Sequence, residues 1–431
     1  MSKIKNIFAR EILASGGAPS LEVTITLESG AVGEASVSYG ASAGSKEATV
    51  LLDGDKSRYN GKGMLNAINN INTKIKEILV GMEASDQRSI DNKMIEVDGT
   101  VNKAVLGGNA MLGVSLAVCR AEANEEKIPV YKYLRKVYNI EPSSLESYDE
   151  SQWQLPKPMI VMIEGGKHAD ETTDLQEFMV GAMGSKTAAE NVRMEMEIYS
   201  ALKNILKTEK LSTNVGNEGA FAPNGIVSNE KPIEYLVTAI KDAGYTPGVD
   251  AGVGIDAAAS EFYSEESKKY TLKLEGKELT SEELIAYYKP WIEKYPIATM
   301  EDMLSEFDWD NWPKMVEAIN GKFPLIADDL TVTNVTLWQK AIDMKAATAI
   351  LIKLNQAGTL TETIDCCLLA RKYNLMTMPS HRGGGETNDT FMVDLAVAVG
   401  SAYIKVGPTR GERVCKYNRL MRIEEELKNE Q

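Results

Sequence analysis

The sequence is poor in the residues that build disulfide frameworks, imidazole metal centres and membrane spans. Its 431 residues include four cysteines and two histidines. The cysteines lack the spacing of a zinc site, so we expect buried, reduced thiols in a cytoplasmic protein rather than a redox or metal role. No apolar stretch approaches the roughly 18–20 residues of a membrane span, and residues 1–10 contain no apolar signal core.

Positive charge is also scarce. Lys and Arg number 47 against 62 Asp and Glu, which gives a formal net charge of −15. An acidic surface disfavours nucleic acid and anionic membranes as partners, although a local basic pocket can still take a small anionic substrate. The composition, 43% hydrophobic and 25% charged, is that of a soluble globular protein. A chain of 431 residues is too long for one typical core, which favours two domains.

Two kinds of pattern divide the chain. Residues 21–27 alternate apolar and polar side chains, so we expect antiparallel strands over 3–40. Helical spacing follows over 64–82, and small apolar residues over 110–120 indicate a buried helix. Serines and prolines over 138–158 predict a linker. Beyond about residue 155 strands alternate with helices, which favours a parallel sheet closed into a barrel.

Six short apolar runs in the second half each lead into a polar residue able to do chemistry. These residues are Asp256, Glu301, Asp328, Lys353, His381 and Lys405. Successive runs are separated by about the length of one strand, one helix and two loops. Because parallel strands joined by helices bring their carboxyl ends to one face, we expect these side chains to converge on one mouth.

Carboxylates and lysines at one mouth can hold a divalent metal and move protons. Asp256, Glu301 and Asp328 offer the hard oxygens that Mg²⁺ prefers; for any one alone, a carboxylate that caps a helix is the alternative. Burial and nearby cations can lower the pKa of Lys353 or Lys405 enough to make a base. Structural ion pairs are the alternative for the lysines. Three carboxylates in register near lysines favour metal.

Glycine-containing loops carry further candidates. His168 follows Gly165-Gly166-Lys167, and His381 precedes Arg382 and the glycines that begin at Gly383. Arg382 beside three glycines is typical of an anion cradle, with a bare glycine-rich turn as the alternative. Both histidines lie in loops, where binding residues concentrate.

Acidic residues and a small-residue loop complete the candidates. Glu177 ends an early segment of the second domain, and Glu218 lies in a glycine-flanked turn. Paired carboxylates can raise one another's pKa, which would make one of them a usable general acid. The loop over 40–44 could reach over the barrel mouth as a lid in which Ser42 offers an oxygen, with a plain flexible turn as the alternative.

The motifs together resemble the enolase (phosphopyruvate hydratase) family from end to end. The segments that carry the resemblance are Ala9-Arg10-Glu11-Ile12-Leu13, Tyr39 to Gly44, Gly165-Gly166-Lys167-His168-Ala169, Leu175-Gln176-Glu177-Phe178-Met179, Asn214 to Pro223, Gly254 to Phe262, Glu301-Asp302, Ala327 to Asn334, Lys353-Leu354-Asn355-Gln356 and Ser380-His381-Arg382.

The resemblance implies an α/β fold with an N-terminal α+β capping domain over 1–140 and a C-terminal enolase-type (β/α)8 barrel, the catalytic domain, over 141–431. It implies a lyase that interconverts 2-phospho-D-glycerate and phosphoenolpyruvate plus water in glycolysis and gluconeogenesis. It also implies two Mg²⁺ sites and a homodimer or higher homo-oligomer, with the Arg10 and Glu412 segments as candidate subunit contacts.

The resemblance also implies a role for each candidate residue. Lys353 resembles the base that removes the C2 proton, and Glu218, supported by Glu177, resembles the acid at the C3 hydroxyl. The first Mg²⁺ would be bound by Asp256, Glu301 and Asp328, and a second Mg²⁺, which also contacts the phosphate, by Ser42. The phosphate would be bound by Arg382, with Gly383 beside it, and the substrate carboxylate would be contacted by Lys405. Further active-site contacts would come from His168, Gln176 and His381.

Several positions depart from the family's usual residues. Gly16 stands where an arginine is usual, Asn217 replaces the aspartate beside the acid, and Met303 replaces a proline. The loop from Gly383 is one residue longer and lacks a serine hydroxyl, and the segment from Val406 is also altered. These changes leave two alternatives open: a divergent enolase paralogue that dehydrates a related phosphorylated or phosphonylated hydroxy acid, and a non-catalytic scaffold on the same fold.

Overall fold

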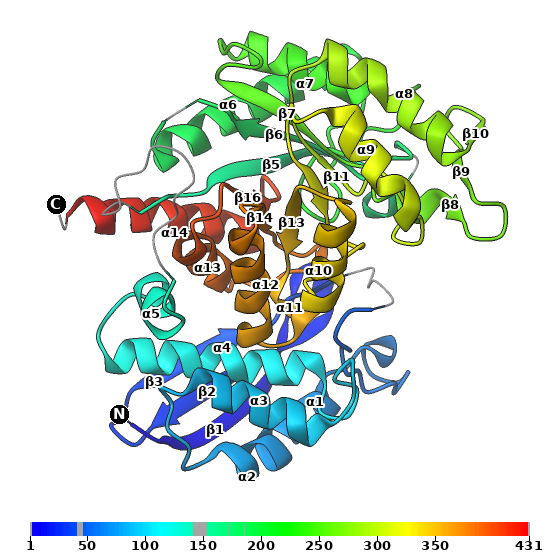
Figure 1. The fold of residues 1–431 in the computed structure, drawn as a ribbon. Helices are drawn as coiled ribbons and strands as arrows, with labels where there is room; N and C mark the ends of the chain where they lie inside the picture. The colour runs from blue at the N-terminus through cyan, green and yellow to red at the C-terminus, as the bar shows by residue number, and fades with distance from the viewer. Residues whose placement is uncertain (1, 41–45, 141–152, 171, 185, 430–431) are drawn as a thin grey trace.

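The computed structural model describes residues 2–40, 46–140, 153–170, 172–184 and 186–429 (Figure 1). Most of the expected linker (141–152) and the centre of the expected lid (41–45, with Ser42) therefore lie outside the described residues. No helix within the described ranges is both long enough and apolar enough to cross a membrane.

The N-terminal part is an antiparallel sheet covered by helices. As the alternation predicted, its strands are antiparallel, in the order β1 (Ile4–Leu13), β2 (Pro19–Leu27) and β3 (Val32–Ser36). The helices that follow are α1 (Leu65–Asn70), α2 (Lys76–Leu79), α3 (Gln87–Asp98), α4 (Gly108–Glu125) and α5 (Val130–Val137), with a π-helical turn over Ile71–Ile75. The expected buried helix is α4. It lies so close to β3 that a Cβ on Gly33 would be 2.2 Å from the Ala117 carbonyl oxygen.

The C-terminal part is a nearly closed eight-stranded barrel with helices around it (Figure 1). The strands in spatial order are β14 (Met376–Pro379), β13 (Ala349–Ile352), β12 (Leu325–Ala327), β11 (Ile297–Glu301), β7 (Ala251–Asp256), β6 (Glu177–Ala182), β5 (Lys157–Glu164) and β16 (Tyr403–Val406). A bridge from Ser380 to Lys405 links the two edge strands. Buried side chains such as Met159, Met179 and Leu351 fill the interior.

The outer helices are α6 (Ala188–Thr208), α7 (Lys231–Asp242), α8 (Ser281–Lys294), α9 (Trp312–Ile319), α10 (Val335–Met344), α11 (Leu354–Ala357), α12 (Leu360–Lys372), α13 (Phe391–Val399) and α14 (Gly411–Lys428). A small antiparallel sheet comprises β8 (Tyr263–Ser264), β9 (Lys269–Leu272) and β10 (Lys277–Leu279). A further pair, β4 (Tyr39–Gly40) and β15 (Gly384–Gly385), joins the N-terminal part to the barrel next to the Arg382 loop.

The expectation of an entirely parallel barrel is wrong for one strand. β6 runs antiparallel to both β5 and β7. The reason is local: a loop without a crossover helix joins β5 to β6, and such a connection returns the chain in the opposite direction. Glu177 therefore begins β6 rather than ending a segment, yet it pairs in register with Glu164 and Asp256 at the same end of the barrel.

Candidate active site

The barrel brings the candidate side chains to one pocket at the end predicted from their strands. The pocket is lined by Gly40, His168, Gln176, Glu177, Glu218, Asp256, Ala258, Glu261, Asp302, Asp328, Asp329, Lys353, Ser380, His381, Arg382, Gly383 and Lys405. Glu301 is joined to the pocket by its ion pair with Lys405, at 2.8 Å. Apart from Ser42, every candidate named above from the sequence belongs to this one constellation.

Lys405 is the centre of the acidic side of the pocket. Its ammonium Nζ lies 2.9 Å from Asp256 Oδ2, 2.8 Å from both oxygens of Glu301, and 2.8 Å from Glu177 Oε2. All four side chains are buried. Although burial lowers it, the three carboxylates hold the pKa of Lys405 well above its usual range. Lys405 is thus a fixed positive charge.

Lys353 contacts the third carboxylate. Its ammonium makes an ion pair with Asp328, whose other oxygen accepts a hydrogen bond of 2.9 Å from Gln356 Nε2. Burial lowers the pKa of Lys353, but Asp328 outweighs it and the pKa is raised. Of the two alternatives for this lysine, the structure therefore shows the ion pair, because the Asp328 carboxylate contacts the ammonium directly.

Asp256, Glu301 and Asp328 surround the two lysines with buried carboxylates, and the acidic oxygens close enough to share one cation are those of Asp302, Asp328 and Asp329. Burial together with the charges of Asp256 and Asp328 raises the pKa of Glu301 well above its usual range. A bound cation would relieve this mutual repulsion of the carboxylates. Oxygen donors from separate strand ends suit Mg²⁺.

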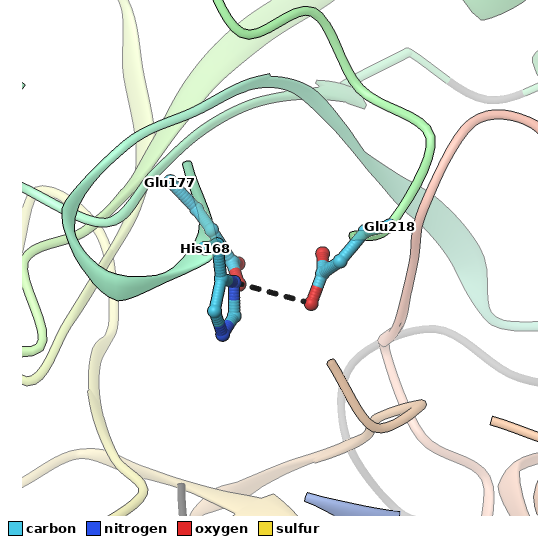
Figure 2. Close-up of side chains that lie close together, drawn as sticks. All are labelled: His168, Glu177 and Glu218. Carbon is cyan, nitrogen blue, oxygen red and sulfur yellow. Dashed lines mark ion pairs between the residues drawn. The ribbon is translucent and has the colours of Figure 1, made fainter. Parts of the chain in front are cut away.

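His168, Glu177 and Glu218 lie together on β6 and two loops (Figure 2), and Glu177 connects this group to Lys405. His168 Nδ1 is 3.1 Å from Glu177 Oε1 and 3.4 Å from Glu218 Oε1. On the other side of Glu218, His381 Nε2 is 3.2 Å from Oε2. Glu218 is therefore held between the two histidines of the chain.

The proton positions in this cluster differ from the sequence expectation of a raised glutamate pKa. Burial would raise the pKa of Glu218, but His381 and His168 hold it well below its usual range. Burial would lower the pKa of His168, yet Glu218 and Glu177 raise it to about 9. The histidine, rather than either glutamate, thus holds the proton at neutral pH.

The Arg382 loop borders the same cluster. Arg382 is buried and its guanidinium lies 3.3 Å from Glu47 Oε1. The next residue, Gly383, approaches so closely that a Cβ there would be 2.6 Å from Glu218 Oε1 and 2.8 Å from His168 Nε2. A serine at position 383 would therefore require the Glu218 and His168 side chains to move, whereas glycine leaves them in place.

Two further residues lie at the edge of the site. Asn217 is exposed and Glu218 beside it is buried, so the charge that is missing at position 217 would face solvent. Gln176 is half-buried, and its backbone N–H donates to the Asp256 carbonyl at 3.1 Å, which ties the loop before β6 to β7.

Sequence reasoning missed several residues of the constellation. Glu164 ends the apolar run 159–163 just as the six others end theirs, so the same signal could have found it. Asp302 accepts the backbone N–H groups of Asp328 and Asp329 at 2.9 and 2.8 Å. Arg413, on α14, donates from Nε to His381 Nδ1 at 3.1 Å, a contact that no local pattern announces.

Comparison with known families covers nearly the whole chain. Residues 4–134 match the family described as "Enolase, N-terminal domain". Residues 152–431 match "Enolase, C-terminal TIM barrel domain", which accounts for the barrel and for every catalytic candidate on it. The chain therefore belongs to the enolase family, a family of metal-dependent lyases.

Proposed function

We propose that the protein interconverts 2-phospho-D-glycerate and phosphoenolpyruvate plus water, with Mg²⁺ as cofactor. The observation that carries the proposal is one pocket that brings together a lysine base candidate, a histidine-held glutamate, an arginine, Asp256 and Asp328, with Glu301 joined to it through Lys405. A scaffold would not require all of these groups in one place. We further propose a cytoplasmic protein with a domain boundary near residue 140.

The reaction removes a proton from C2 and hydroxide from C3, and a C2=C3 double bond forms. In our assignment the neutral amine form of Lys353 accepts the C2 proton at Nζ, and Glu218, an anion in this structure, passes a proton from His168 to the leaving C3 hydroxyl. The proton-rich partner beside Glu218 is His168, 3.4 Å away. Arg382 holds the phosphate and Lys405 stabilises the second negative charge that develops on the substrate carboxylate.

Asp256, Glu301 and Asp328 would hold one Mg²⁺, and Ser42 is proposed for a second. When bound, the ions supply positive charge that offsets Asp328 beside Lys353 and the charge on the substrate carboxylate. A lysine base that acts together with Mg²⁺ is already known in the enolase superfamily, so this pairing is not new.

The test is a spectrophotometric assay of 2-phosphoglycerate with Mg²⁺, watched for phosphoenolpyruvate absorbance. Turnover that EDTA abolishes and Mg²⁺ restores supports the proposal. Metal binding without turnover of this substrate would contradict it and favour the second candidate, a divergent lyase for a related phosphorylated or phosphonylated hydroxy acid.

One observation favours that second candidate: the backbone of Gly383 occupies the space next to Glu218 and His168. A reshaped wall beside the acid changes which leaving group and which C3 substituent fit. Parallel assays of phosphorylated and phosphonylated hydroxy acids would separate the candidates, because only the second predicts a higher kcat/KM for a substrate other than 2-phosphoglycerate.

A further inference from the structure

One fully buried carboxyl next to the proposed acid has no part in the mechanism above. Glu164, the last residue of β5, is 0% exposed. Its Oε1 accepts the backbone N–H of Glu218 at 3.0 Å and that of Ala220 at 2.8 Å, and its Oε2 lies 3.1 Å from the Glu218 nitrogen. The side chain therefore holds the turn that carries Glu218.

The neighbouring backbone is shaped around this carboxyl. A Cβ on Gly216 would lie 2.4 Å from Glu164 Oε2, so only glycine lets the turn close over it. The Glu164 N–H in turn donates to the Phe221 carbonyl at 2.9 Å. The turn is thus attached to β5 by both the main chain and the side chain of one residue.

We propose that Glu164 is a positioning residue for the lyase reaction: its carboxyl fixes the turn of Glu218 and places a second ionisable negative group behind the Glu218–His168 pair. The proposal rests on the proposed function for its kinetic readout only. It concerns a step at C3, so proton removal at C2 by Lys353 should not depend on it.

The charges around Glu164 determine the direction of its effect. Glu218 and His168 face it from the turn and the loop, Glu177 pairs with it in register on β6, and Tyr199 approaches from α6. Burial and the negative charge of Glu218 raise the pKa of Glu164 to about 8. In its ionised form Glu164 also raises the pKa of His168.

Glu164 therefore extends the pH range in which the cluster holds its proton. Below about pH 8 the carboxyl is mostly neutral and acts only through its hydrogen bonds. Above that pH its charge favours the proton on His168 and Glu218. The charge of Glu164 should therefore affect the dehydration step most strongly in alkaline solution.

The conservative variant Glu164→Gln keeps an acceptor oxygen for the turn and removes the charge. The chain has two histidines, so histidine-labelled protein gives two imidazole titrations by NMR. We expect the pKa of His168 to fall by about one unit in Glu164→Gln. The matched control is Glu195→Gln, a fully buried glutamate that accepts one backbone N–H, from Ala182 at 3.0 Å; the control should leave the titration unchanged.

The kinetic arm compares dehydration with C2 proton exchange. In Glu164→Gln the alkaline limb of dehydration should move to lower pH by about one unit while C2 exchange keeps its profile. Glu164→Ala also loses the hydrogen bonds and should slow dehydration at every pH, by about 10²-fold if proton delivery is misaligned. Circular dichroism establishes that the variants are folded.

The results separate this proposal from the proposed function. An unchanged His168 titration in Glu164→Gln overturns the proposal whether or not the enzyme turns over 2-phosphoglycerate. Equal losses of dehydration and C2 exchange at all pH values also overturn it, because they indicate general structural damage. Absence of turnover in the unmodified protein contradicts the proposed function but leaves the NMR test decisive.

Discussion

Replacing Lys405 with methionine should destabilise the protein in a way that depends on metal. The ammonium lies within 2.9 Å of oxygens of Asp256, Glu301 and Glu177, and its side chain is 3% exposed. Methionine fills a similar volume but leaves three buried carboxylates without their shared cation. Removal of one partner from a buried ion pair costs about 3–5 kcal/mol, because the remaining charge stays buried.

The assay is urea unfolding followed by circular dichroism, in EDTA and in Mg²⁺. With a urea dependence of about 3 kcal/mol per molar for a chain of this size, the midpoint in EDTA should fall by about 1–1.7 M. Mg²⁺ at 100 times its dissociation constant should add about 2.7 kcal/mol to the free energy of unfolding. The variant should gain more from Mg²⁺ than the unmodified protein, since Lys405 no longer offsets the carboxylates.

Lys103→Met is the control. Lys103 is also buried, and among the described residues its ion pair is with the half-exposed Glu362, at 2.9 Å. Its loss should cost about 1 kcal/mol and should not depend on metal. A Lys405→Met midpoint no lower than that of the control, or equal losses in EDTA and Mg²⁺, would refute the reasoning that these carboxylates form a cation site.

Three further outcomes follow. Lys353→Ala should stop exchange of the C2 proton with solvent, whereas Glu218→Gln should stop dehydration but retain some C2 exchange, each with a loss on the order of 10²–10⁴-fold; equal exchange in Lys353→Ala and the unmodified protein would overturn the assignment of the base. The fold raises the pKa of His168 from an ordinary 6.5 to about 9. Protonated His168 should therefore add at most about 3 kcal/mol to the free energy of unfolding, in full below pH 6.5 and decreasingly as pH rises through 9. The free energy of unfolding of His168→Gln, measured against pH, should not show this decrease. Light scattering at micromolar concentration should give at least a dimer mass, and a monomer would contradict the proposed subunit contacts at Arg10 and Glu412.

The strands and the location of the site were predictable because both follow from periodicity. Alternation over 21–27 predicted β2, and apolar runs that end in Asp256, Glu301 and Asp328 predicted one mouth of a barrel. These are local signals, and a parallel arrangement converts them into proximity. The antiparallel direction of β6 was not predicted, because strand direction depends on the connection between strands. The apolar pattern of residues 177–182 carries no information about that direction.

The charge states were not predictable, because they depend on which atoms meet. Burial alone would lower the pKa of Lys353 and raise that of Glu218. The structure gives the opposite direction in both, since Asp328 contacts the lysine and two histidines flank the glutamate. No spacing in the sequence encodes these pairings.

Arg413 shows how such a pairing determines chemistry. Its Nε donates to His381 Nδ1, so the remaining imidazole proton is on Nε2 and points to Glu218. Burial lowers the pKa of His381, and the positive charge of Arg413 lowers it further, against the pull of Glu218. Arg413→Met should therefore raise the pKa of His381 in the same histidine-labelled NMR titration, whereas Arg413→Lys, which keeps the charge, should raise it less. A His381 that titrates identically in all three proteins would show that Arg413 does not control the imidazole. If the pKa rises, an imidazolium at neutral pH holds Glu218 more firmly as an anion, and dehydration slows while C2 exchange by Lys353 continues.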